Sequence, residues 1–77
     1  MIKYVIVEKC GVTAAIIFPP HIAHSDVVGR DVKAVSAGFC SMSNGKLYAM
    51  GESESLHLSH TDADEVLIQK TLQRLKL

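Results

Sequence analysis

The sequence has no tryptophan, only two prolines and only two cysteines, Cys10 and Cys40. Two cysteines are too few for the disulfide framework that stabilises many small secreted domains. The chain also lacks a basic segment followed by an apolar stretch at its start, and no apolar run reaches the roughly 20 residues that a membrane helix requires. We therefore expect a cytoplasmic protein with reduced thiols and no contact with a membrane.

Neither sign of charge is in excess, because eight basic residues balance eight acidic residues. Proteins that bind nucleic acid through its phosphates need many lysines and arginines, since much of their affinity comes from the counterions that these side chains release. The sequence has no such excess and no basic run interleaved with aromatic residues. The composition therefore argues against nucleic acid as a partner.

Apolar residues, by contrast, make up 48% of the 77 positions. This fraction is ample for a packed core and argues against disorder. A chain of this length buries only about 60% of the surface that it exposes when unfolded, so small domains are often stabilised further by a metal, disulfides or a partner subunit. We predict a single α+β domain over residues 1–77.

A β-hairpin is predicted at the start of the chain. Its arms run over Ile2–Glu8 and Val12–Phe18, which are rich in β-branched and aromatic residues, and its turn lies at Lys9–Gly11. The second arm is apolar on both of its faces. Because a strand of this kind needs cover on both sides, we predict that a second copy of the chain supplies part of that cover in a homo-oligomer.

The middle of the chain predicts a short helix and a second hairpin. Two consecutive prolines end the preceding strand, and a helix can follow from about Pro20 to Val28. A strand with alternating apolar residues then leads to Asn44-Gly45, which is a strong signal for a type I′ turn, and Leu47–Met50 return as its partner.

The last third of the chain predicts a break and then an amphipathic helix. Glutamates and leucines share one strand face after Met50, so we expect a bulge or break near Gly51–Ser55, with an extra short strand before the helix. The helix runs from Asp62 onward and is capped by Thr61 or Asp62. Its apolar stripe consists of Ile68, Leu72 and Leu75. The predicted fold is thus a small ββαββα domain, with an antiparallel sheet from two hairpins, a short middle helix and a C-terminal amphipathic helix.

All four histidines occur in two His-x-x-His pairs, His21 with His24 and His57 with His60. Residues three apart share a face of a helix, so the first pair could meet one metal ion, whereas the same spacing on a strand places the second pair on opposite faces. No Cys-x-x-Cys pair completes a zinc site. We therefore predict no metal and no cofactor. The alternative is a metal-dependent hydrolytic enzyme that uses these histidines with the glutamates of the stretch GESES.

Small and hydroxylated residues fill the strands that should lie at the centre of the sheet. They leave room for a packed helix, which is the more frequent use, or for a ligand. A ligand in this space would contact Arg30, Lys33, Ser36, Gly38, Glu52, Ser53, Ser55 and His57. The stretch GESES lacks the last glycine of the G-x-S-x-G nucleophile motif, and we predict no catalytic residue.

The stretches VSAGFCS, NGK and GESESLHLSHTDADEVLI resemble a group of small uncharacterised proteins encoded by phages and prophages. In that group a strand ending in Ser-Ala-Gly-Phe precedes a hairpin, a Gly-Glu-Ser-x-Ser-Leu segment and a C-terminal helix. The residues that carry the resemblance are Ser36, Ala37, Gly38, Phe39, Gly51, Glu52, Ser53, Ser55 and Leu56. The stretch SHTDADE departs from the group, which has an Arg-Pro pair there, so no anion-binding role of that turn is transferred. The resemblance implies an accessory phage protein that acts in the host cytoplasm and binds host factors or defence components.

These observations favour a binding protein over an enzyme. We predict a non-catalytic, phage-type accessory protein that forms a homo-oligomer and modulates a host process or host defence by binding a protein partner. One alternative is a pocket at the oligomer interface that sequesters a small metabolite or a nucleotide signal. The other is the metal-dependent hydrolytic enzyme.

Overall fold

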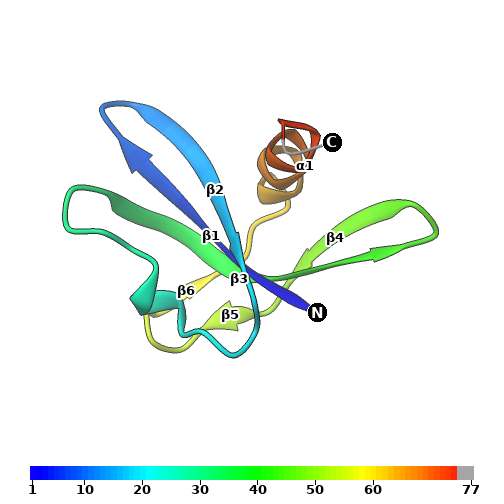
Figure 1. Cartoon of the computed structure of the whole chain (residues 1–77), viewed down its shortest axis with the longest axis horizontal. Coiled ribbons are helices and arrows are strands. Elements are labelled where there is room, and N and C mark those ends of the chain that lie inside the picture. The colour runs from blue at the N-terminus through cyan, green and yellow to red at the C-terminus, as the bar shows by residue number, and fades with distance from the viewer. Residues whose placement is uncertain (75–77) are drawn as a thin grey trace.

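The computed structural model describes residues 1–74, which form two antiparallel sheets, a short 3-10 helix and one α-helix (Figure 1). The large sheet has the strand order β2-β1-β3-β4, with bounds β1 Ile2–Lys9, β2 Val12–Phe18, β3 Lys33–Ser43 and β4 Lys46–Met50. The small sheet consists of β5 (Glu52–Ser53) and β6 (Leu58–Ser59), and helix α1 spans Asp64–Arg74. The predicted α+β class is confirmed, and the ββαββα layout is matched only roughly. None of the helices within residues 1–74 is long and apolar enough to cross a membrane.

Both predicted hairpins are present, and each reverses through two residues with positive φ. These residues are Cys10 and Gly11 in the first turn (φ 53° and 78°) and Asn44 and Gly45 in the second (φ 53° and 79°). Two consecutive positive φ angles are typical of type I′ turns, whose twist matches that of the flanking strands. Because β1 continues through Lys9, the first turn is one residue shorter than predicted.

The predicted middle helix from Pro20 to Val28 is wrong. Only η1, a three-residue 3-10 helix over His24–Asp26, forms in this segment, and Ala23 before it is extended (φ −73°, ψ 145°). The apolar residues explain the difference, because Ile22 and Val27 would diverge by about 140° on an α-helix. In the irregular conformation both pack onto the same face of the sheet.

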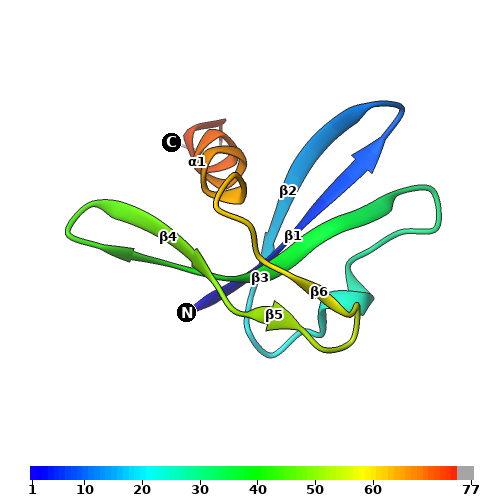
Figure 2. The same ribbon diagram turned by 180° about the vertical axis from the view of Figure 1, so that it is seen from behind.

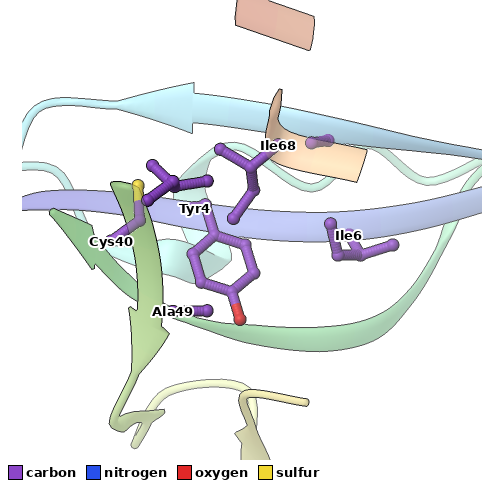
Figure 3. Packing of buried hydrophobic residues seen from close by; sticks show 7 residues of the cluster. Tyr4, Ile6, Cys40, Ala49 and Ile68 are labelled. Atoms are coloured by element: carbon purple, nitrogen blue, oxygen red, sulfur yellow. The ribbon is translucent and has the colours of Figure 1, made fainter. Parts of the chain in front are cut away.

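Helix α1 covers one face of the large sheet, between the two hairpins (Figures 1 and 2). Beneath the helix lies a cluster of buried residues: Tyr4, Ile6, Ala15, Cys40, Leu47, Ala49 and Ile68. Figure 3 shows the Tyr4 ring between Cys40 and Ile6, with Ile68 of the helix above it. Of the predicted apolar stripe, Ile68 is fully buried and Leu72 is 39% exposed, while Leu75 lies outside the described residues.

The opposite face of the sheet is covered by residues 19–32 together with β5 and β6, which we call the loop layer. Figures 1 and 2 show this layer on the side of the sheet away from α1. Under it lie Val5, Val7, Phe18 and Ala37, all buried, with partly buried residues such as Leu56 and Leu58 packed against them. The chain therefore covers β1 on both faces by itself. The prediction of cover by a second copy concerned β2, whose first residues are exposed, and it stays a prediction.

The predicted break after the second hairpin is confirmed at Gly51. Strand β4 ends at Met50, Gly51 adopts φ 74°, and β5 then joins a separate sheet with β6. The carbonyl of Gly51 accepts a hydrogen bond from the backbone N–H of His60, at 3.0 Å, which ties the end of β6 to this bend. Strand β6 is the extra short strand expected before the helix.

Candidate functional site

The small residues at the centre of the sheet are used for packing. Ser36 is 3% exposed and faces the helix side, where its hydroxyl donates to Asp64 at 2.8 Å. A Cβ atom at Gly38 would lie 2.5 Å from the backbone oxygen of Met50. Only glycine therefore allows the backbone at Met50 to approach β3 so closely. Of the two uses that the sequence leaves open for Ser36 and Gly38, packing is the one observed.

The serines of GESES stabilise the turn between β5 and β6. Ser53 is 1% exposed, and its hydroxyl oxygen accepts the backbone N–H of Leu56 at 3.2 Å. The hydroxyl of Ser55 accepts the backbone N–H of Ser25 at 3.3 Å and thereby ties this turn to η1. His57 is exposed and has φ 56°, so it serves as a turn residue.

Arg30 and Lys33 are not brought together with the other predicted ligand residues. Both are exposed, and Lys33 lies opposite Glu8 at the end of β1. Neither residue lines the polar pocket described below, whereas Glu52 and Ser55 do. The eight predicted ligand residues therefore do not form one site.

The four histidines lie in different environments and do not share one site. His24 is buried, with its Nε2 2.9 Å from the carbonyl oxygen of Gly38, and His60 places its Nδ1 2.8 Å from the carbonyl oxygen of Gly51. Since a carbonyl oxygen only accepts, each of these ring nitrogens carries the hydrogen. His21 and His57 are exposed. Across residues 1–74, no group of three or more histidine, cysteine, aspartate or glutamate side chains is arranged to hold a metal.

The ring of His24 also packs between two aromatic rings. Its centroid lies 5.3 Å from that of Phe18 and 5.7 Å from that of Phe39, and both pairs are close to perpendicular. Phe18 and Phe39 lie on either side of Lys3 in the register of the sheet. His24 is thus the residue that holds η1 onto the sheet, which the His-x-x-His spacing did not indicate.

Sequence reasoning also missed the role of Asp64. Its carboxylate is 3% exposed and accepts four hydrogen bonds. The donors are the Tyr4 hydroxyl (2.6 Å), the Ser36 hydroxyl (2.8 Å), and the backbone N–H (2.9 Å) and hydroxyl (2.7 Å) of Thr61. The available signal was the spacing Thr-x-x-Asp, a variant of the capping box in which the residue at N3 reaches back to the N-cap.

The network shifts the pKa values of its two ionisable members in opposite directions. Burial alone would raise the pKa of Asp64, but the hydrogen bonds from Tyr4, Thr61 and Ser36 outweigh it and hold that pKa below its ordinary value. Burial and the hydrogen bond to the Asp64 carboxylate together raise the pKa of Tyr4 well above its ordinary value. At neutral pH Asp64 is therefore ionised and Tyr4 is protonated, so the network ties α1 to strands β1 and β3.

A polar pocket of about 330 Å³ opens between the sheet and the loop layer. It is lined by Lys3, Ala23, His24, Phe39, Glu52, Glu54 and Ser55. The pocket thus brings together β1, β3, β5 and the segment around η1, which are distant in the sequence. The sequence did not predict Lys3 as a contributor, because nothing local links it to GESES, and it offered His24 only as a metal ligand in the alternative reading.

A second cavity, an apolar groove of about 380 Å³, lies next to the β3–β4 hairpin. It is lined by Met1, Ile2, Ile17, Met42, Leu47 and Leu72, together with Cys40 and Ser41. The thiol of Cys40 is buried, and burial raises its pKa, so it is a poor nucleophile. Cys10 and Cys40 are both free, one exposed and the other buried.

Comparison of the chain with protein-family models, with curated proteins and with solved structures found no match. The resemblance to phage-encoded proteins therefore stays an expectation from the sequence.

Proposed function

We propose that the protein is a non-catalytic accessory binding protein of the phage type, which forms a homo-oligomer and modulates a host process or host defence by binding a protein partner. The observation that carries this proposal is the apolar groove. Four of its lining side chains remain open to solvent: Met1 is 70% exposed, Met42 59%, Ile2 46% and Leu72 39%.

Single exposed apolar side chains are normal on protein surfaces and need no explanation. Here, however, they border one concave surface, and a contiguous apolar surface of this kind is typical of protein interaction sites. Burial of apolar surface contributes about 25 cal/mol per Å², so covering the groove would stabilise an assembly. The groove is therefore the part of the surface that supports association with a protein.

A second copy of the chain is the occupant that we assign to the groove. In a two-fold symmetric dimer the same patch meets itself, so a side chain that protrudes from one copy can enter the hollow of the other. Met42 combines both properties, since it lines the groove and is more than half exposed. Its side chain is flexible enough to fill an irregular hollow.

The placement of the reactive side chains supports binding over catalysis. Asp64, Ser36 and Ser53 are buried in structural hydrogen bonds, and His24 and His60 donate to backbone carbonyls. A catalytic nucleophile needs an activating base within hydrogen-bond reach and access to a substrate. These five residues contribute to the fold instead.

The test is sedimentation velocity of the wild-type protein and of Met42→Glu over a dilution series. We expect the wild-type protein to be oligomeric and Met42→Glu to be monomeric, because the charge would have to be buried in the groove. Val66→Glu is the matched control, since Val66 is 58% exposed on α1 and lies outside the groove. It should sediment like the wild-type protein. A wild-type chain that is monomeric at every concentration would show that the oligomer does not form.

The partner is tested with the same three proteins as bait in lysate of a bacterial host. We expect one host protein to be retained in a fixed molar ratio by the wild-type chain and by Val66→Glu, and to be lost with Met42→Glu, because the partner binds the assembled oligomer. Equal retention by all three would show that partner binding does not require the oligomer and would contradict the proposal.

A further inference from the structure

The polar pocket has a wall that combines both signs of charge with an aromatic ring. Lys3 comes from β1, Phe39 from β3 and Glu52 from β5, and Glu54 and Ser55 follow on the turn after β5. Formally, two carboxylates face one ammonium group, so the lining carries an excess of one negative charge. A ligand that matches this wall brings a positive group for the glutamates and a negative group for the lysine.

The second ring nitrogen of His24 is an acceptor with no hydrogen-bond partner among residues 1–74. Nε2 donates to the carbonyl of Gly38, so Nδ1 of the neutral ring is the acceptor. Within the described part of the chain, no hydrogen bond reaches Nδ1, yet no side-chain nitrogen or oxygen that is sealed from solvent lacks a partner. Nδ1 therefore keeps some contact with solvent although the residue is only 3% exposed, and His24 is one of the residues that line the polar pocket.

Lys3 is held in place at the pocket wall. Its Nζ donates to the carbonyl oxygen of Ile22 at 2.9 Å and lies 5.9 Å from the centre of the Phe39 ring. An ammonium group has three N–H donors, so two remain for a ligand. Because the side chain is already oriented, it loses little conformational freedom when it binds an anion.

We infer that the polar pocket binds a small zwitterion of the amino-acid type. The ammonium group of the ligand donates to the carboxylates of Glu52 and Glu54 and to Nδ1 of His24, and its carboxylate accepts from Lys3. A volume of about 330 Å³ lies at the lower end of the range for small-molecule sites, which suits a ligand of this size.

This inference takes a small molecule as ligand and does not depend on the apolar groove or on oligomer formation. The two sites share no lining residue. Loss of oligomers in Met42→Glu therefore leaves the pocket intact, and failure of the pocket leaves the sedimentation result unchanged.

The experiment titrates the wild-type chain with each of the twenty free L-amino acids, followed by calorimetry and by amide chemical shifts. We expect at least one amino acid to bind with saturation and to shift the amides of Ala23 and Ser55 at the pocket. Methylamine and acetate, which each carry only one of the two charges, should bind at least tenfold more weakly. Absence of saturation with all twenty amino acids would overturn the inference.

Two substitutions locate the ligand. Glu52→Gln and Lys3→Met should each weaken binding tenfold or more, because each removes a charged hydrogen-bond partner. Glu8→Gln and Lys33→Met are the matched controls, since these two exposed residues lie opposite each other at the far end of β1 and outside the pocket. Affinity that is unchanged in Glu52→Gln and Lys3→Met would place the ligand elsewhere and overturn the inference. If Lys3→Met does not fold, Glu54→Gln replaces it in the experiment, because Glu54 lies at an exposed turn position.

Discussion

The two faces of the large sheet are covered in different ways. Within residues 1–74, seven core residues are buried and two are partly buried on the helix face, whereas four are buried and eight are partly buried on the loop face. The helix face is closed by a regular element whose start is fixed by the buried carboxylate of Asp64. The loop face is closed by irregular chain that is fixed by the imidazole of His24. Each face keeps one of the two cavities described above: the apolar groove lies beside α1 on the helix face, and the polar pocket lies under the loop layer.

The largest expected effect comes from removing the anchor of the helix face. Asp64→Ala should lower the free energy of unfolding by about 3–5 kcal/mol, because the buried hydroxyls of Tyr4 and Ser36 lose their acceptor and the helix loses its cap. Urea denaturation measures this change. Asp62→Ala is the control, since Asp62 is exposed in the same turn, and it should cost much less. If both variants lost the same free energy of unfolding, the four hydrogen bonds of Asp64 would add nothing to the effect of a negative charge at the start of the helix.

Removing the anchor of the loop face should have the next largest effect. His24→Ala should cost about 2–4 kcal/mol, because it leaves a cavity between Phe18 and Phe39 and an unpaired carbonyl at Gly38. Hydrogen exchange should show faster exchange in residues 19–32 and in β5 and β6 than in α1, since local opening follows local packing. The exposed His21 provides the control His21→Ala, which should change neither quantity. Uniform loss of protection in both layers would contradict the distinction between them.

A smaller change should follow when one donor of the Asp64 network is removed. Tyr4→Phe keeps the ring in the core and removes the hydroxyl, so we expect a cost of about 1.5–3 kcal/mol, the range for a hydrogen bond to a charged group. Tyr48→Phe is the control, because Tyr48 is 40% exposed on β4. Denaturation curves of the two variants compare them directly. A Tyr4→Phe variant as stable as wild type would show that water or another donor replaces the hydroxyl.

The smallest expected effect is a change in the pH dependence of stability, which is measured in acid. The pKa of Asp64 is lower in the folded chain than its ordinary value of 3.8, so its ionised form contributes stability above that value. This contribution should begin to disappear as the pH falls through 3.8, and should be gone once the pH is below the folded-state pKa. Urea midpoints measured from neutral to strongly acidic pH should fall more steeply for the wild-type chain than for Asp64→Asn. Parallel curves would contradict the lowered pKa.

Local patterns predicted most of the strands and the last helix. The arms of the first hairpin, the turn at Asn44-Gly45 and the break at Gly51 each depend on residues that are neighbours in the chain, and all were found where expected. The middle helix was wrong because the contacts that shape this segment lie across the fold. Its apolar residues pack against the buried side chains of the strands.

The sequence predicted the candidate sites less well than it predicted the strands and the last helix. GESES was noted as a cluster of polar residues, but its partners in the polar pocket, Lys3 and His24, are contributed by β1 and η1. The small size of Ser36 and Gly38 left two uses open, packing and a ligand, and could not decide between them. In the fold one carries a hydrogen bond to Asp64 and the other allows a close crossing of the backbone.

Residue preferences and short spacings were thus enough to specify the hairpins, the type I′ turn at Asn44-Gly45 and the C-terminal helix, because the forces involved act between residues a few positions apart. The fold alone decided that Asp64 would meet Tyr4, that His24 would enter an aromatic cleft, and that the loop layer would cover the second face of the sheet. Those contacts join residues from 6 to 60 positions apart along the chain. Burial determines them, and burial is a property of the assembled chain.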